Sequence, residues 1–431
     1  MATSLAGCRE AAQLPISSEE GPTPALPAPV KRLIPTANIA PAHGWDQGAR
    51  PMSPSGAKVT AFATQLQHPR WVYVLPNQDV LVAETNAPPK PDDHKGVKAW
   101  VMKQFMKKAG SAGPSANRLT LLRDTDHDGK ADVQKIFVSE LSSPLGMAVI
   151  GSNLYVANTD SIVRFPYADG DTVARGNGVK LVDLPAGTIN HHWTKNIIAS
   201  RDGKKLYAAV GSNSNAGENG IEQEAGRAAI WEIDVATGAH RVFASGLRNP
   251  CGLAWEPRTG ALWTDVNERD ELGSDVPPDY LTSVREGGFY GFPYSYFGGH
   301  VDERAKPPRP DLVATALVPD YALGPHTASL GLAWADKGVP LRFREGMYVG
   351  QHGSWNRRPL SGYKVIFVPF EGGKPAGPPI DILTGFLGPE GQAYGRPVGV
   401  AVDKEGGLLV ADDVGDTVWR VAPAPVSASR E

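Results

Sequence analysis

Four stretches of this chain place a basic, amide or imidazole side chain just before a run of apolar residues. One of them is GLRNPCGLAW, and the side chains concerned are His192, Arg248, Asn249, His326 and Arg396. A guanidinium beside a buried strand is costly unless it finds a partner. If these groups converge, they repel one another unless an anion lies between them. The pattern therefore predicts a site for a multiply charged, oxygen-rich ligand.

Each of these residues also has a simpler explanation. Any single arginine is equally well explained by a bidentate bond to a carboxylate of the protein. His192, in NHHWTKNI, is either a satisfied core histidine or a general base, since neighbouring cations favour the neutral imidazole. Lys195, three residues further on, is another candidate cation for the ligand. The recurrence of these groups across several stretches favours a common site.

Two acidic segments are candidates for a calcium site. The segment 264–281 is dense in oxygen donors, which suits Ca²⁺ and equally suits a solvated loop. In DTDHDGKAD, the carboxylates of Asp124, Asp126 and Asp128 alternate before a glycine. Lys135 stands where an EF-hand needs its last glutamate, so this segment is either a calcium-binding hairpin loop or a merely polar one.

The elements that must position these residues form a repeat. Its copies are HPRWVYV with DVLVAET, SPLGMAV with NLYVANT, TKNIIAS with KKLYAAV, NPCGLAW with GALWTDV, ASLGLAW with GMYVGQH, and RPVGVAV with GLLVADD. Each copy has the pattern of a strand, a turn and a strand, and six copies predict an all-β fold, a six-bladed β-propeller. The strand-like run 58–66 would complete the last blade and close the ring. A short helical insertion at 97–108 and mouth loops near 288–300 and 352–362 complete the expectation.

Composition sets the remaining bounds. A net charge of −3 gives no general attraction to nucleic acid or membranes. LAGC has the form of a lipoprotein processing site at Cys8, either by chance or because the protein is exported, periplasmic and lipid-anchored. We expect residues 1–54 to be a processed or flexible tether, 55–424 the propeller and 425–431 a flexible tail. The other cysteine, Cys251, is expected to be a small buried thiol.

Several motifs together resemble those of the glucose/sorbosone dehydrogenase family, and most closely its sorbosone dehydrogenase branch. They are GLRNP, HHWTKNI, GGFYGFP, QHGSWNR and GRPVGVAV, and the resemblance extends from about residue 58 almost to the end. It implies a six-bladed propeller that binds pyrroloquinoline quinone (PQQ), a tricarboxylate, together with Ca²⁺.

The resemblance also implies roles for individual residues. His192 matches the catalytic base, Arg248 and Asn249 match a cofactor-binding pair, and Arg396 matches an arginine on the cofactor carboxylates. The backbone carbonyls of Asn267 and Glu268 fall where the family holds calcium. Three positions depart from the pattern. Ser212 replaces an aspartate of the glucose-specific members, Val398 replaces an arginine, and a cofactor-contacting lysine has Arg357 or Arg358 as its only candidate substitutes.

The implied activity is oxidation of the hydroxyl of a sugar, lactol or hydrated aldehyde, with hydride transfer to the quinone. A cytochrome or a membrane quinone would then accept the electrons. Two alternatives remain open: a calcium-dependent lactonase or esterase, and a non-catalytic binding propeller. The cationic character of the axial positions disfavours the calcium cage that a lactonase needs.

Overall fold

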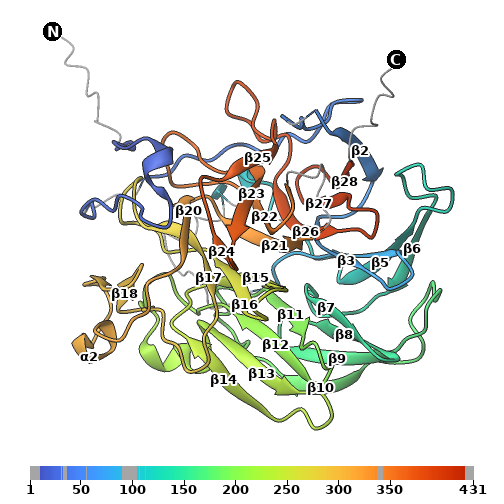
Figure 1. Ribbon diagram of the computed structural model, residues 1–431, viewed down its shortest axis with the longest axis horizontal. Coiled ribbons are helices and arrows are strands. Elements are labelled where there is room, and N and C mark those ends of the chain that lie inside the picture. Colours follow the sequence, from blue (N-terminus) through green and yellow to red (C-terminus); the bar gives the residue numbers. More distant parts are fainter. Residues whose placement is uncertain are drawn as a thin grey trace.

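The six-bladed β-propeller predicted from the repeats is confirmed in the computed structural model of the chain (Figure 1). The structure describes residues 10–30, 32, 36–54, 56–89, 104–105, 107–111, 113–336 and 343–422. Cys8, the tail from 423 and most of the expected helix at 97–108 lie outside these residues. None of the described helices has the length and apolar character of a membrane span.

Each blade is an antiparallel sheet whose innermost strand lies on the axis. The first three blades contain β3 (Pro69–Val74), β4 (Val80–Glu84), β5 (Arg118–Arg123) and β6 (Val133–Val138); β7 (Met147–Ile150), β8 (Asn153–Ala157), β9 (Ser161–Pro166) and β10 (Val179–Asp183); and β11 (Lys195–Ala199), β12 (Lys205–Val210), β13 (Ala229–Asp234) and β14 (His240–Ser245). The fourth and fifth contain β15 (Pro250–Trp255), β16 (Leu262–Val266), β17 (Pro278–Ser283) and β20 (Tyr321–Pro325); and β21 (Ser329–Ala335), β22 (Gly346–Gln351), β23 (Lys364–Glu371) and β25 (Ile380–Leu383). The sixth contains β26 (Pro397–Val402), β27 (Leu408–Asp412), β28 (Thr417–Ala422) and β2 (Lys58–Ala63).

The closing strand comes from the other end of the chain, as the sequence predicts. β2 pairs with β28 in the antiparallel sense, with Lys58 opposite Ala422. The sixth blade thereby joins residues from both ends of the propeller, and the ring has no open edge at this point.

Glycines in the repeat allow the innermost strands to approach one another. A Cβ on Gly331 would collide with the carbonyl oxygen of Val398, and one on Gly252 with the side chain of Leu332. In the third blade Asn196 takes this place, and its Nδ2 donates to the carbonyl oxygen of Cys251 at 2.9 Å. Contacts between innermost strands run from β7 through β11, β15, β21 and β26 to β3.

The third blade differs from the expected alignment of the repeats by one residue. Both β11 and β15 pair their first residue with the end of the next strand, Lys195 with Val210 and Pro250 with Val266. β15 then contains a register shift that β11 lacks. The equivalent of Ala254 is therefore Ile198, and not Ala199 as the alignment of the motifs suggests.

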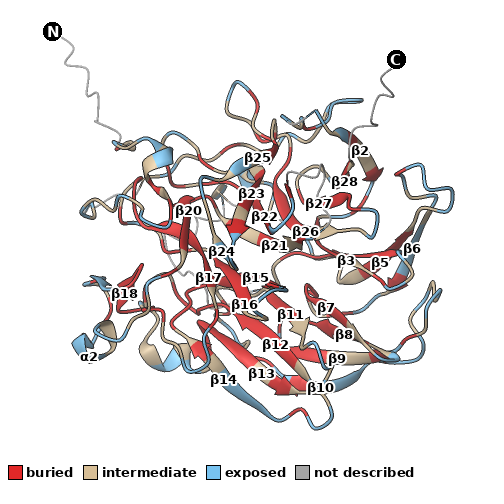
Figure 2. Cartoon of the chain, viewed as in Figure 1, coloured by how far each residue is buried: buried red, intermediate tan, exposed pale blue. Residues whose placement is uncertain are grey.

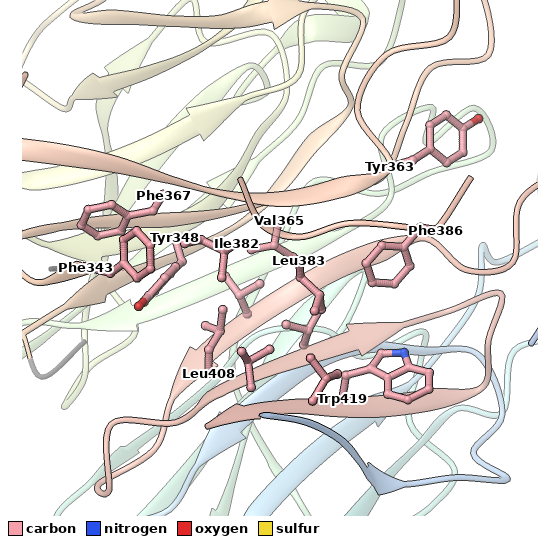
Figure 3. Close-up of a cluster of buried hydrophobic side chains, with 14 of the residues drawn as sticks. Phe343, Tyr348, Tyr363, Val365, Phe367, Ile382, Leu383, Phe386, Leu408 and Trp419 are labelled. Atoms are coloured by element: carbon pink, nitrogen blue, oxygen red, sulfur yellow. The ribbon is translucent and has the colours of Figure 1, made fainter. Parts of the chain in front are cut away.

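Apolar side chains between blades form the core, and buried positions concentrate on the inner strands (Figure 2). Figure 3 shows one such cluster, between the fifth and sixth blades. Tyr348 and Phe367 come from the fifth blade, and Leu408 and Trp419 come from the sixth. Because both faces of each sheet are covered, the blades hold their inner ends in fixed positions.

The N-terminal segment is packed against the propeller, contrary to the expected flexible tether. Within residues 10–54, β1 (Glu20–Gly21) pairs with β20, and the Trp45 indole donates to Asp412 at 2.7 Å. Glu10 accepts bonds from the backbone and hydroxyl of Ser274, each at 2.7 Å. A proline-rich composition gave no sign of this packing, because it depends on a few buried polar side chains with distant partners.

Short elements decorate this frame. The two-stranded pair β18 (Ser295–Tyr296) and β19 (His300–Val301) lies in the insertion around 288–300, and helix α2 (Pro310–Val313) follows it. Two 3-10 turns, η1 (Ile16–Ser18) and η2 (Ile221–Glu224), and the short strand β24 (Lys374–Pro375) complete the assigned elements. Arg269 is buried in this insertion between the rings of Phe292 and Tyr296, at 5.2 and 5.8 Å from their centroids.

Candidate active site

The candidate base and the amide of the cofactor-binding pair lie side by side at the end of the axis where innermost strands begin. A Cβ added to Gly211 would collide with both Asn249 Oδ1 and the Cβ of His192. Asn249 is 5% exposed, and its Oδ1 is buried without a hydrogen-bond partner among the described residues. A buried acceptor without a donor is unusual and indicates a missing ligand or water.

The hydrogen bonds of His192 define its tautomer. Its Nδ1 lies 2.9 Å from the carbonyl oxygen of Ser212 and 3.0 Å from the hydroxyl of the same residue. A carbonyl only accepts, so Nδ1 carries the proton and Nε2 carries the lone pair of the neutral ring. The Ser212 hydroxyl in turn donates to Ser214 O at 2.7 Å. The arrangement suits a general base acting through Nε2.

Lys195 supports the chain beside the base. The side chain is fully buried, and Nζ donates to the carbonyl oxygens of Trp193 at 3.2 Å and His192 at 3.5 Å. These bonds hold the backbone of the segment that carries His192. The sequence predicted Lys195 as a cofactor-binding cation, whereas these contacts give it a positioning role.

Arg248 is 1% exposed, and every nitrogen of its guanidinium donates to the protein. Nε and Nη2 bond Asn215, at 3.0 Å to its backbone oxygen and 2.9 Å to its side chain. Nη1 bonds the carbonyl oxygens of Asn267 and Glu268 at 3.1 and 2.7 Å. Asp270 Oδ2 lies 3.7 Å from Nη2. Burial lowers the pKa of Arg248, and the Asp270 carboxylate opposes this shift.

This geometry does not fit a calcium ion on the two predicted carbonyls. The structure brings Arg248, Asn267 and Glu268 together, and the guanidinium itself bonds both carbonyl oxygens. The Glu268 carboxylate is engaged by the Arg269 side chain at 2.9 Å. A divalent cation at these oxygens would lie against a buried positive charge with little compensation.

Arg396 retains donor capacity. It is 3% exposed, and Nη2 donates to the carbonyl oxygen of Ala40 at 3.2 Å. Its guanidinium carbon lies 5.1 Å from the centre of the Tyr363 ring, and Nε is buried without a partner among the described residues. A cation with an unsatisfied nitrogen fits the carboxylates of an anionic ligand.

The two arginines proposed as substitutes for a lysine differ from each other. Arg357 is saturated: it bonds Ser274 O at 3.0 Å, Pro359 O at 3.2 Å and the Glu19 carboxylate at 3.0 Å. Each of its guanidinium nitrogens therefore already makes a bond to the protein, and Arg357 holds the N-terminal segment. Arg358 is half-buried, and its Nε is buried without a partner in the described part of the chain.

His326 belongs to the polar surroundings of Arg248. Its Nε2 lies 2.8 Å from Gly273 O, and its Nδ1 lies 3.9 Å from Asp270 Oδ1. Burial lowers its pKa, with Asp270 opposing. The imidazole is thus neutral at pH 7 and adds no positive charge to the site.

Sequence reasoning missed a charged cluster at the same mouth, formed by Arg70, Asp413, His352 and His68. Arg70 Nη1 donates to Asp413 Oδ2 at 2.7 Å, and the same oxygen lies 2.9 Å from His352 Nε2 and 3.7 Å from His68 Nε2. Burial lowers the pKa of His352 to about 4 despite Asp413. Burial raises the pKa of Asp413, but its histidine and arginine neighbours outweigh this and lower it far below the usual range.

The sequence contains a weak signal for this cluster. HPR opens the first repeat, and DD ends the second strand of the last one. These residues meet only because the ring closes between those two blades. Arg70 also lies 5.9 Å from the centre of the Trp193 ring, next to the candidate base. Asp413 N bonds Arg396 O at 3.4 Å, so this cluster adjoins both His192 and Arg396.

The three aspartates of the second acidic segment lie elsewhere. One oxygen from each of Asp124, Asp126 and Asp128 lies within 4.8 Å of the others. Asp124 Oδ2 accepts from Gly129 N at 2.9 Å, and Asp128 Oδ1 from Lys130 N at 2.8 Å. This loop joins β5 to β6. Because alternate strands run in opposite directions, it lies at the far end of its blade from the mouth.

Cys251 is a buried thiol beneath the site, as expected. Its Sγ lies 3.4 Å from Asn249 O, and burial raises its pKa well above the usual value. A thiol held in its protonated form is a poor nucleophile.

The fold and the mouth define a propeller whose axial site combines an imidazole with arginines suited to an anionic ligand. The sequence profile of the TrAA12-like family matches residues 110–294 and 313–424, which is more than half of the chain. This protein belongs to the TrAA12-like family.

Two relatives show the range of similarity. A protein of Borreliella burgdorferi described as uncharacterized is 28% identical over 296 residues, 65% of this chain and 76% of that protein. The "Pyrroloquinoline quinone-dependent pyranose dehydrogenase" of Coprinopsis cinerea is 28% identical over 225 residues, 42% of this chain and 30% of the enzyme. This chain therefore spans less than a third of the fungal relative.

Solved structures share the fold. The holo PQQ domain of pyranose dehydrogenase from Coprinopsis cinerea has a TM-score of 0.69 and 21% identity, covering 89% of this chain and 100% of that domain. A calcium structure of a family AA12 enzyme from Trichoderma reesei has a TM-score of 0.70 and 18% identity, covering 90% and 99%. The expected resemblance is confirmed in its coarser form, and the sorbosone branch stays a prediction.

Proposed function

We propose that this protein is a PQQ-dependent oxidoreductase that oxidises the hydroxyl of a sugar, lactol or hydrated aldehyde, including sorbosone-like substrates. The named fungal relatives, which are PQQ-dependent sugar dehydrogenases, support this proposal. The observation that carries it is the pair His192 and Asn249 at the mouth, where the side chain of the candidate base lies beside a buried amide oxygen without a partner among the described residues.

In this proposal His192 takes the proton of the substrate hydroxyl on Nε2, while its Nδ1–H stays bonded to Ser212. PQQ, when bound, supplies the two-electron acceptor for the hydride that leaves the same carbon. Arg396 and Asn249 would hold the cofactor, because each presents a buried polar atom without a protein partner. Arg248 would shape the pocket through its bonds to Asn215, Asn267 and Glu268.

Whether Ca²⁺ takes part in the reaction is left to the reconstitution experiment. The proposed reaction contains no step at Ca²⁺, because the predicted carbonyls are bonded to Arg248. The Asp124 loop remains a proposed calcium position at the far end of the blade. Export, a lipid anchor at Cys8 and a cytochrome or quinone as electron acceptor are likewise proposals, supported by the LAGC motif and by the redox chemistry.

The test is reconstitution of the purified apoprotein. PQQ is added with Ca²⁺ or with a chelator, and dye reduction is followed with a panel of aldoses and aldehydes. Turnover that depends on PQQ supports the proposal, and its response to the chelator shows whether Ca²⁺ takes part. Metal-dependent lactone opening without PQQ would instead indicate the hydrolase alternative. Failure to bind PQQ at all would leave a binding propeller of another kind.

A further inference from the structure

The arginines of the mouth differ in how many donors they have left. Every guanidinium nitrogen of Arg248 and of Arg357 donates to a protein acceptor. Among the described residues, Arg70 makes a single side-chain hydrogen bond, from Nη1 to Asp413 at 2.7 Å. Its Nε is buried and has no partner. Of the three, only Arg70 has guanidinium nitrogens that make no hydrogen bond to a described residue.

The position of Arg70 places these nitrogens in the candidate active site. The residue lies in β3, the innermost strand of the first blade, and its guanidinium carbon is 5.9 Å from the centre of the Trp193 ring. Trp193 directly follows the candidate base. On the other side, Asp413 adjoins Arg396, whose Nε also lacks a partner. Arg70 therefore lies between Trp193, which follows the base in the chain, and Asp413, which is bonded to Arg396.

The neighbours of Arg70 hold its guanidinium in one orientation. The Asp413 carboxylate is almost fully buried, and it also accepts from His352 Nε2 at 2.9 Å. Fixed in this way, the planar group presents its remaining edge in a set direction, which favours recognition of a carboxylate. The side chain keeps 13% of its surface exposed, so a ligand can reach it.

We propose that Arg70 binds a carboxylate of the tricarboxylate quinone, in the place that the sequence assigned to Arg357 or Arg358. The inference rests on the proposed function and names a further residue of that same site. Asp413 and His352 are positioning residues that orient the guanidinium. The buried Nε atoms of Arg70 and Arg396, which have no partner among the described residues, then have one explanation. Each would donate to a carboxylate of the bound cofactor.

The experiment measures PQQ binding to the apoprotein by equilibrium dialysis and by quenching of tryptophan fluorescence. Arg70→Met removes the charge while keeping much of the side-chain volume, and Arg70→Lys keeps the charge without the planar fork. We expect Kd to rise about 10- to 100-fold for Arg70→Met and by a smaller factor for Arg70→Lys. Arg241→Met is the matched control, because Arg241 lies on β14, the outer strand of the third blade, where it pairs with Glu232 and Glu286. It should leave Kd unchanged.

Circular dichroism and thermal unfolding of each apoprotein separate binding from folding. If Arg70→Met does not fold, Arg70→Lys and Asp413→Asn decide the matter, since both should weaken binding. Folded Arg70 variants that bind PQQ within about twofold of the wild type would overturn the inference and leave the proposed function standing. A wild-type protein that binds no PQQ would instead refute the proposed function itself.

Discussion

At the scale of single residues, Ser212 stands beside the candidate base at the position where the glucose-specific pattern has an aspartate. Ser212 bonds His192 Nδ1 through both its carbonyl and its hydroxyl oxygen. These neutral acceptors fix the tautomer, but they stabilise an imidazolium less than a carboxylate does. Elsewhere at the mouth, the Asp413 carboxylate contacts His352 and His68.

The role of His192 can be tested by replacing it with glutamine. Loss of a general base lowers turnover by about 10²- to 10⁴-fold. PQQ affinity should stay nearly constant, because Asn249, Arg70 and Arg396 are unchanged. Turnover by dye reduction and Kd by dialysis are measured on the same preparation. A collapse of affinity with turnover preserved per bound cofactor would show that His192 positions a ligand and is not the base.

Ser212→Asp introduces a carboxylate at the position where the glucose-specific pattern has one. We expect the acidic limb of the pH profile of kcat/KM to move to higher pH by about one unit, because a nearby negative charge favours the imidazolium. Ser212→Ala is the control: it removes the hydroxyl but keeps the backbone carbonyl that holds Nδ1. An unchanged profile in Ser212→Asp would argue that His192 does not limit the rate.

At the scale of elements, the N-terminal segment organises the loops beside the mouth. It bonds the loop 270–275 through Glu10 and Gln13, and the loop 352–361 through Asn38 and Glu19. These loops carry Asp270, Asn356, Arg357 and Arg358. The shape of the mouth therefore depends on a segment that precedes the first blade in the sequence.

Glu19 makes this contact sensitive to pH. Burial raises the pKa of Glu19 to about 8, with Asp275 adding to the shift and Arg357 opposing it. A raised carboxyl pKa gives stability that is complete below the ordinary value near 4.5 and is lost as pH rises through about 8. Between pH 6 and pH 9 we expect Glu19→Gln to lose roughly 2 °C less in Tm than the wild type. Parallel Tm curves for the two proteins would show that Glu19 is not protonated in the folded state.

At the scale of the whole molecule, the site exists because the ring closes. Arg70 comes from the first blade, His192 from the segment before the third, and Asp413 and Arg396 from the sixth. β2 pairing with β28 joins the chain ends of the ring, and the axial glycines let neighbouring innermost strands approach. A change at the axis should therefore affect both stability and the site.

Gly331→Ala tests this packing. Its Cβ would collide with the carbonyl oxygen of Val398, which lies in β26 of the next blade. We expect a loss of about 1–3 kcal/mol in the free energy of unfolding, measured by urea titration, together with weaker PQQ binding. Gly299→Ala is the control, because nothing lies within 4 Å of its Cβ position. Equal stability of the two variants would contradict the close approach of these blades.

The sequence by itself determined the blade count, the closing strand and the position of His192, Asn249 and Arg396 just before innermost strands, because the repeat places them at equivalent starts of those strands. Local patterns were sufficient here, since each blade repeats the same strand and turn chemistry.

Only the tertiary structure decided which cations have donors to spare. Arg357 donates to Glu19, which lies more than 300 residues away in the chain. Arg248 donates to the carbonyls that the sequence assigned to calcium. Arg70 stands out only when the first and sixth blades meet. Hydrogen-bond saturation depends on partners far apart in the sequence, and no local spacing encodes it.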